Sequence, residues 1–364
     1  SSQHILMTQQ NKTLGEFIIN KQSEFKYSSG ELTRLINSIR LAGKIVNHEV
    51  VAFTGIIAAT STQDYEKDII KKHEDTLEYK EEIFVKYLKT VGFNAEPVLL
   101  TYPNNDALGG IISSVMQTRA EYEFTTTHRD THYLWPVSEA PVVSEISEIF
   151  KKMPTLYIAD GHHRSSSSCL LAQELAQENK NHTPKAAYNY FMSFLIPESD
   201  LKIFEFNRLI RDLNGLSKEE FLIQLDYSFR IENRAQHFYK PTKKHHFSMY
   251  LDGDFYSLYL RKDTYEINNA LQALDTQILY KLIFEPILGI KDLRNDTRIA
   301  YTDGKKDMAF VKTAIDTKEF AVGFGMLPVT TQEMKKIADE GLKMPPKSTF
   351  IEPKLRSGIT IYEF

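Results

Sequence analysis

One short stretch constrains the fold more than any other: an apolar strand, a glycine turn and a helix start. The run Leu156–Ile158 breaks at Asp160-Gly161, and two histidines, an arginine and four serines follow before a helical pattern from Cys169. This order aims free main-chain N–H groups and the positive end of a helix dipole at one place, which suits an anion. A plain helix cap made by Asp160 or Ser165, with surface histidines, is the alternative.

The side chains of the turn are also suited to phosphate. Guanidinium, imidazole and hydroxyl groups donate hydrogen bonds to phosphate oxygens. We therefore predict that Gly161, His163, Arg164 and Ser165 bind a nucleotide. Asp160 is the candidate magnesium ligand, because magnesium that is held mainly by nucleotide phosphates asks for only one or two protein carboxylates.

Composition excludes several classes of protein. The chain has 364 residues, 42% of them hydrophobic and 25% charged, which fits a soluble protein of two or three domains. A net charge of −4 gives no support for nonspecific nucleic-acid binding. The single cysteine, Cys169, excludes a disulfide framework and fits a reducing cytoplasm. No apolar run approaches about 18 residues, so we expect no membrane span.

The hydrophobic period changes near residue 50. Before it, apolar residues recur at three-to-four spacing, which predicts a pair of helices over 13–49. After it, strands and helices alternate, which predicts an α+β fold of mixed sheets with flanking helices. The strands are expected near 51–59, 95–102, 122–127, 133–137, 156–159, 188–195, 204–209, 247–251, 255–260, 299–302 and 320–324. The helices are expected near 79–91, 111–119, 142–150, 218–225, 271–282 and 331–340 and from residue 169 onward.

Most of the chain, from about residue 51 to residue 364, resembles the domain-of-unknown-function 1015 family. The resemblance rests on motifs at 70–76, 80–82, 96–102, 134–135, 157–164, 206–215, 274–275, 286–289 and 344–354. The Asp-Gly-His-His-Arg stretch at 160–164 also resembles the phosphate-binding turn of the ParB and sulfiredoxin superfamily, which includes nucleotide-binding partition proteins and a free serine kinase. That resemblance implies a nucleotide-binding core, which we expect over 51–185. We expect an N-terminal helical segment over 1–50 and a C-terminal α+β domain over 186–364.

The first fifty residues resemble a different family. Residues 12–50 are similar to the N-terminal helices of class I fructose-1,6-bisphosphatase, where the Gly-Glu-Leu-Thr stretch, here Gly30 to Thr33, receives the phosphate of AMP. The carboxylate-rich metal site and the Asp-Pro-x-Asp-Gly signature of that enzyme appear nowhere downstream. We therefore reject fructose bisphosphatase activity. A natural fusion, a gene-model join and a chimaera all stay open, as does AMP regulation.

A charged stretch before the helix at 79–91 supplies a candidate base. The family resemblance places Glu74 and Lys80 among its characteristic residues. If they face the Gly161 turn, Glu74 can accept a proton from a substrate hydroxyl and Lys80 can neutralise phosphate charge. We group Glu74 with Asp160 and His162 as the candidate catalytic residues. The alternative is a solvated, exposed run of charges.

The loop Met344-Pro-Pro-Lys-Ser-Thr349 is a further candidate. Two prolines stiffen the backbone before Lys347, Ser348 and Thr349, three groups able to hold an anion, although a plain surface turn reads equally well. The charged residues at 207–208 and 211–215 are interpreted as a structural ion-pair corner. Cys169 is interpreted as a small buried hydrophobe.

These observations predict a phosphotransferase that uses ATP or ADP with Mg²⁺ on a small hydroxylated metabolite, with free serine as the first guess. A ParB-like nucleotide-binding module without small-molecule turnover is the alternative. Sugar-phosphate phosphatase chemistry, the third hypothesis, lacks the carboxylate cluster that it needs. The amphipathic N-terminal residues must bury their apolar face somewhere, either on this domain or in a homo-oligomer.

Overall fold

The computed structural model describes residues 35–46, 49–127, 130–303 and 306–364. They form two compact units. The first unit holds the described residues up to Leu201 together with Pro353–Phe364, and the second unit is Lys202–Glu352. Strands and helices are mixed in both units, which confirms the α+β class. In the described part of the chain, no helix combines the length and apolar character that a bilayer crossing requires.

The first unit is built on a mixed sheet. Among the described residues, its strands lie in the order β3-β8-β5-β9-β2-β1-β7-β6. These strands are β1 (Leu35–Val46), β2 (Glu49–Ser61), β3 (Ile70–Lys71), β5 (Val98–Tyr102), β6 (Tyr122–Thr125), β7 (Thr131–Pro136), β8 (Leu156–Asp160) and β9 (Tyr190–Pro197). The helices are α3 (Thr62–Glu66), α4 (Glu78–Val91), α5 (Asp106–Met116), α6 (Ala140–Lys151), α7 (His162–Glu178) and a 3₁₀ turn, η1 (Ala187–Asn189). A small pair, β4 (Phe93–Asn94) with β18 (Tyr362–Glu363), ties the returning chain to this unit.

Residues 35–46 form strand β1, whereas the sequence predicted a pair of helices over 13–49. The first of them lies outside the described residues, but 35–46, assigned to the second, is a strand that pairs antiparallel with β2 and β7. The apolar residues Ile39, Leu41 and Ile45 also fit a period of two, so spacing alone did not separate helix from strand. Pairing with β2, which follows directly in sequence, and with the distant strand β7 decides the outcome. The predicted helical segment is wrong over these residues.

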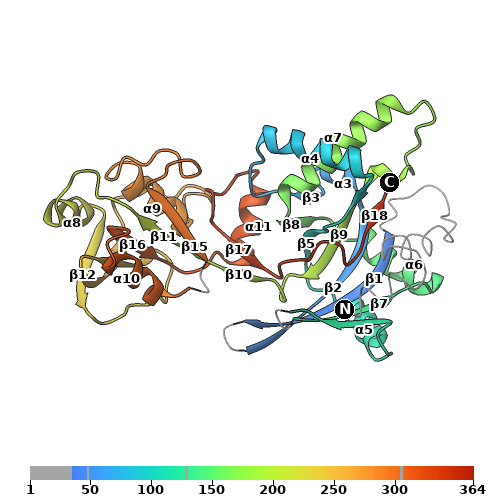
Figure 1. Ribbon diagram of the computed structural model, residues 1–364, viewed down its shortest axis with the longest axis horizontal. Helices are drawn as coiled ribbons and strands as arrows, with labels where there is room; N and C mark the ends of the chain where they lie inside the picture. Colours follow the sequence, from blue (N-terminus) through green and yellow to red (C-terminus); the bar gives the residue numbers. More distant parts are fainter. Residues whose placement is uncertain (1–34, 47–48, 128–129, 304–305) are drawn as a thin grey trace. The chain divides into compact units, whose positions relative to one another are not determined.

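Helices cover both faces of the sheet in the first unit. Helices α4 and α7 pack together on one face, and α5 and α6 lie on the other (Figure 1). The inner strands are buried from both sides, and Ile56, Ile57, Ala58 and Ala59 of β2 are almost fully inaccessible. Such strands read as continuous apolar runs. The sheet is therefore a rigid support for β8 and for the turn that follows it.

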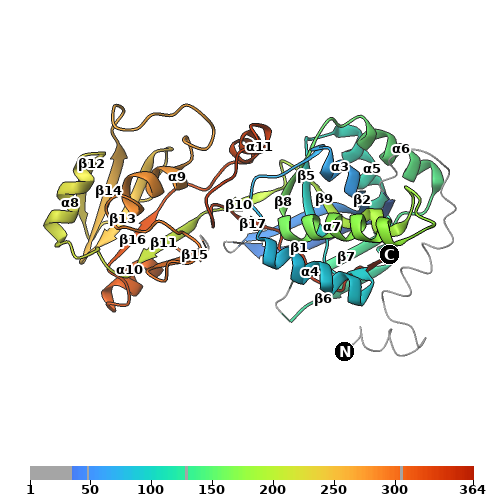
Figure 2. The same cartoon turned by 90° about the horizontal axis from the view of Figure 1, so that it is seen from above.

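The second unit is an antiparallel sheet with helices on each side (Figure 2). The described strands run in the order β12-β14-β13-β16-β11-β15. They are β11 (Phe206–Ile210), β12 (Phe229–Ala235), β13 (His246–Leu251), β14 (Asp254–Leu260), β15 (Ile299–Asp303) and β16 (Val322–Gly325), with a separate pair β10 (Lys202–Phe204) and β17 (Phe350–Glu352). The helices are α8 (Lys218–Asp226), α9 (Asp275–Leu279), a π-helical turn η2 (Tyr280–Phe284), α10 (Met308–Asp316) and α11 (Thr331–Asp339).

Alternation along these strands divides the core of the second unit in two. Ile210 packs with α8, α9 and η2 on one face, and its neighbour Leu209 packs with α10 on the other. The helix starts follow local sequence signals. Ser217 and Thr330 each form a capping box with a glutamate three residues on.

Candidate functional site

The candidate site is the turn between β8 and α7. Gly161 takes a left-handed conformation, with φ of +102°, and α7 begins directly after it without a side-chain cap. Its first main-chain hydrogen bond runs from Ser165 N to Gly161 O. The N–H groups before Ser165 have no acceptor within the helix, so they and the helix dipole face one place. The predicted strand, turn and helix are confirmed here.

Arg164 lies directly against the glycine. A Cβ atom on Gly161 would come within 2.8 Å of Arg164 Nη2 and 2.9 Å of its Nε. The Nη1 atom donates to Glu96 Oε1, and Ser357 Oγ donates to the other oxygen of Glu96. The buried Nε atom has no hydrogen-bond partner among the described residues. The guanidinium is thus positioned by one carboxylate and keeps a donor for a further acceptor.

The two histidines of the turn hold the loop that precedes α4. His162 Nε2 accepts a hydrogen bond from the main-chain N–H of His73, at 3.3 Å. His163 Nε2 accepts one from the main-chain N–H of Leu77, at 3.1 Å. Both imidazoles therefore present an unprotonated Nε2 to the loop. The structure brings 73–77 against the turn, although almost ninety residues separate them in sequence.

Glu74 lies on this loop, beside the rings of two histidines. One carboxylate oxygen is 3.8 Å from His162 Nδ1, and the other is 4.0 Å from His73 Nε2. The histidine side chains are buried, and their rings meet edge to face with centroids 4.5 Å apart. The Glu74 side chain is 40% exposed, so solvent and small molecules can reach it. A carboxylate in this position can accept a proton near the helix start.

Asp160 is the last residue of β8 and directly precedes the turn. Its Oδ2 accepts a hydrogen bond from Lys354 Nζ at 3.0 Å, which ties the returning chain to the end of β8. Throughout the described ranges, no group of three or more histidine, cysteine or acidic side chains gathers as a metal site. Asp160 is half-exposed and can still supply the single carboxylate that a phosphate-held magnesium ion needs.

The serine run after Arg164 packs α7 against α4. Ser165 is fully buried, and its hydroxyl lies within hydrogen-bonding distance of the carbonyls of Gly161 and His162. Its single O–H is therefore committed to the main chain. Ser166 donates to the carboxylate of Glu81, and Ser167 bonds to main-chain oxygens. These small side chains let α4 approach closely, and Lys80 stands exposed on its first turn, next to Glu81.

The three candidates of the proline loop belong to the second unit. The Ser348 hydroxyl is buried and meets Thr276 Oγ1 at 3.1 Å and the carbonyl of Pro345 at 2.7 Å. Lys347 is exposed, and its carbonyl oxygen accepts a hydrogen bond from Arg208 at 3.0 Å. Thr349 is half-buried. The Ser348 hydroxyl therefore stabilises the loop through hydrogen bonds within the second unit.

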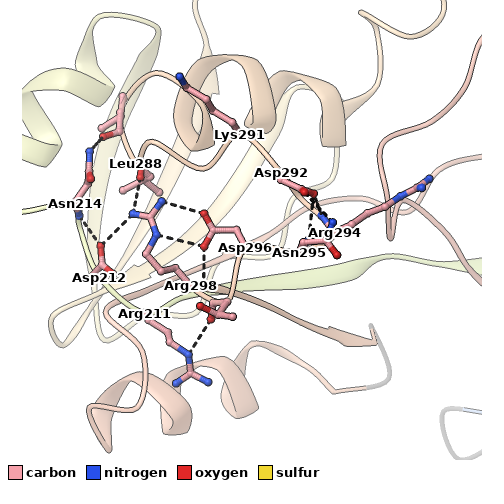
Figure 3. Close-up of polar contacts among 12 residues, drawn as sticks. Arg211, Asp212, Asn214, Leu288, Lys291, Asp292, Arg294, Asn295, Asp296 and Arg298 are labelled. Atoms are coloured by element: carbon pink, nitrogen blue, oxygen red, sulfur yellow. Dashed lines mark hydrogen bonds and ion pairs between the residues drawn. The ribbon is translucent and has the colours of Figure 1, made fainter. Parts of the chain in front are cut away.

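The charged residues at 211–215 form a structural corner, as predicted. Arg298 meets Asp212 at 3.5 Å and Asp296 at 3.1 Å, and Asn214 Nδ2 donates to the carbonyl of Ile287 (Figure 3). Arg208, by contrast, is buried and donates to carbonyl oxygens, and burial lowers its pKa to about 10. It therefore braces the proline loop and takes no part in that corner.

Two contacts of the site were missed by sequence reasoning. Glu96 is the partner of Arg164, and Glu81 is the acceptor for Ser166. Both residues stand in motifs of the family resemblance, but no local spacing connects them with a turn that lies 68 and 85 residues away. Cys169 is a buried free thiol whose pKa is raised by burial, in agreement with its interpretation as a small hydrophobe.

Comparison with known proteins places the chain in a family. Residues 42–277 match the family described as protein of unknown function, DUF1015. The chain belongs to the DUF1015 family. The matched range contains the loop of Glu74, the turn at Gly161 and the end of β1.

Several solved structures are similar at low identity. A mutant of a free serine kinase in complex with AMP is 11% identical, with 91% of this chain and 95% of that chain covered and a TM-score of 0.41. C-terminally truncated SbnI from Staphylococcus aureus is 11% identical over 81% of this chain and 82% of that chain, with a TM-score of 0.41. A conserved hypothetical protein from Pyrococcus furiosus is 11% identical over 83% and 94%, with a TM-score of 0.38.

Proposed function

We propose that this DUF1015 protein transfers a phosphoryl group from ATP or ADP to the hydroxyl of a small metabolite, with free serine as the first substrate to test. One observation carries the proposal. The carboxylate of Glu74 is held beside a helix start that has no side-chain cap and that carries Arg164. A proton acceptor beside an anion site provides the two parts that phosphoryl transfer to an alcohol needs.

The main chain of the turn and Arg164 bind the transferred phosphate. The N–H groups at the start of α7 donate to its oxygens, and the Nε atom of Arg164 adds a charge-assisted hydrogen bond. Lys80, exposed on the first turn of α4, supplies further positive charge. Lys347 belongs to the second unit, and its anion-binding role stays a sequence-based prediction. The serines at 165 and 348 do not enter the proposal, because their hydroxyls are bonded within the protein.

Glu74 is the base in this proposal. It takes the proton of the substrate hydroxyl as the oxygen attacks the terminal phosphorus, and the bond from phosphorus to the bridging oxygen breaks. The leaving nucleotide keeps the electron pair, so ATP gives ADP, or ADP gives AMP. His162 and His163 act as positioning residues, because their Nε2 atoms accept main-chain hydrogen bonds from the Glu74 loop.

Magnesium would be bound mainly by the nucleotide phosphates. Asp160 would supply the protein carboxylate, since it stands at the end of β8 directly before the turn. The bound ion would neutralise charge on the phosphates. Lys354 also donates a hydrogen bond to Asp160, and this contact keeps the returning chain against the turn.

The experiment is a product assay with matched variants. The protein is incubated with ATP or with ADP, magnesium and serine, and then with other small alcohols, while nucleotide consumption and the phosphorylated product are measured. Glu74→Gln should reduce turnover by about 100-fold or more with nucleotide binding retained. Arg164→Ala should reduce both turnover and nucleotide binding. Glu78→Gln, an exposed glutamate at the start of α4, and Arg230→Ala, an exposed arginine of the second unit, are the controls.

Two results would contradict the proposal. If no alcohol is phosphorylated and nucleotide nevertheless binds at the turn, the chain is a nucleotide-binding module without turnover. If Arg164→Ala changes neither binding nor turnover, the turn is not the phosphate site.

A further inference from the structure

A cavity of about 380 Å³ lies beside Arg164 in the first unit. Its walls are mainly apolar and include Phe84 and Tyr87 of α4 and Phe191 of β9. Polar groups enter it from Arg164, from Glu96 and from Ser357 on the returning chain. Apolar walls with a few convergent polar groups are typical of small-molecule sites, whose usual volumes begin near 300 Å³.

Helix α4 exposes apolar side chains on the face that meets this cavity. Two apolar residues of the helix are buried, Val85 and Leu88, and Leu88 also lines the cavity. Yet Ile83 is 63% exposed, Tyr87 is 47% exposed and Phe84 is 37% exposed, and all three line the cavity. Clustered exposed apolar groups beside polar ones are typical of a binding surface.

Arg164 connects the cavity with the phosphate turn. Its guanidinium lies against Gly161, and the same residue lines the cavity. A nucleotide that places its phosphates at the start of α7 therefore has the cavity next to it. The remaining part of such a ligand is a sugar with a flat heteroaromatic base.

We propose that this cavity binds the base and ribose of the nucleotide, an inference that rests on the proposed function. The rings of Phe84 and Tyr87 provide faces for stacking, which is tolerant of the kind of base. Ser357 and the carboxylate of Glu96 stand at the polar end, where they can bond to ribose hydroxyls or an exocyclic amino group. The cavity thus sets the preference for a nucleotide over inorganic phosphates.

The test compares ADP with pyrophosphate as ligands, by calorimetry on the full chain. Phe84→Ala and Tyr87→Ala should each weaken ADP binding about tenfold, since one stacked ring contributes about that factor. Pyrophosphate binding should change less than about twofold. Tyr79→Ala is the matched control, because Tyr79 is an exposed tyrosine of the same helix that does not line the cavity. Thermal unfolding verifies that each variant is folded.

The outcomes separate this inference from the proposed function. Unchanged ADP affinity in both cavity variants, with pyrophosphate bound by the parent protein, would overturn the cavity alone. Equal losses of ADP and pyrophosphate would also overturn it, because the side chains would then act on the turn. If the parent protein binds neither ligand, the phosphate site itself is wrong and the cavity assignment falls with it.

Discussion

The Nδ1 atom of His162 lies 3.8 Å from a carboxylate oxygen of Glu74, and the Nε2 atom of the same ring accepts the main-chain N–H of His73. One imidazole therefore touches both the side chain and the backbone of the loop that precedes α4. His163 adds a second attachment at Leu77. These contacts hold Glu74 close to the start of α7, which is the preorganisation that the proposed catalytic role of Glu74 requires.

Removing the His163 ring should loosen the Glu74 loop. His163→Ala deletes the acceptor of the Leu77 N–H, a bond that contributes about 1 kcal/mol. The Leu77 amide should then exchange with deuterium about fivefold faster, and phosphoryl transfer should fall more than nucleotide affinity. His182→Ala, at an exposed histidine whose ring contacts the hydroxyl of Tyr188, should change neither the exchange at Leu77 nor phosphoryl transfer. Unchanged exchange at Leu77 would show that the hydrogen bond does not hold the loop.

Adding one methyl group at the turn should displace Arg164. In Gly161→Ala the new Cβ would lie 2.8 Å from Arg164 Nη2, so the guanidinium must shift from its present position. We expect ADP affinity to fall at least tenfold. The left-handed alanine should also lower the free energy of unfolding by about 1–2 kcal/mol. Gly92→Ala has the same backbone strain, with φ of +75° and open space around the Cβ, and should bind ADP normally. Equal affinities in the two variants would refute the role of Arg164.

The thiol of Cys169 should be unreactive in the folded protein. Burial raises its pKa, so the reactive thiolate is scarce at neutral pH. Ellman's reagent should label less than a tenth of the protein within an hour and one equivalent after unfolding in urea. Rapid labelling of the native protein would mean that α7 opens readily from the sheet.

Stability of the second unit should fall between about pH 4 and pH 6. Burial raises the pKa of Asp275 to about 6 from its ordinary 3.8, with Lys244 opposing the rise. In that window the folded state keeps a proton that the unfolded state has lost. This contribution to stability is therefore fully present below pH 3.8, the ordinary pKa of an aspartate. It is lost as pH rises through about 6, the pKa of Asp275 in the folded protein, and the loss reaches about 3 kcal/mol.

Asp275→Asn should remove this pH dependence. Urea unfolding followed by circular dichroism at pH 4.5 and pH 7 measures it, and the variant should be the more stable protein at pH 7. Asp263→Asn, at an exposed aspartate of the same unit, is the control and should behave like the parent. A parent protein that is equally stable at the two pH values would contradict the prediction.

Local signals predicted much of this fold, and distant pairings account for what they missed. The strand, turn and helix around Gly161 are readable because a buried run, a glycine and a polar helix start follow one another in sequence. Strand β1 was assigned to a helix because its apolar spacing fits both periods and its partners β2 and β7 decide between them. The Glu74 loop was a candidate, but its attachment to His163 has no signature in residues so far apart.

Residues 353–364 return to the first unit after the whole second unit has been traversed, and they bring Lys354 to Asp160 and Ser357 to Glu96. During translation, the ribosome must therefore make all of Lys202–Glu352 before these partners exist. A nascent chain that stalls within that insert would leave the turn unfinished. A product shortened in this way would lack the contacts of Lys354 with Asp160 and of Ser357 with Glu96.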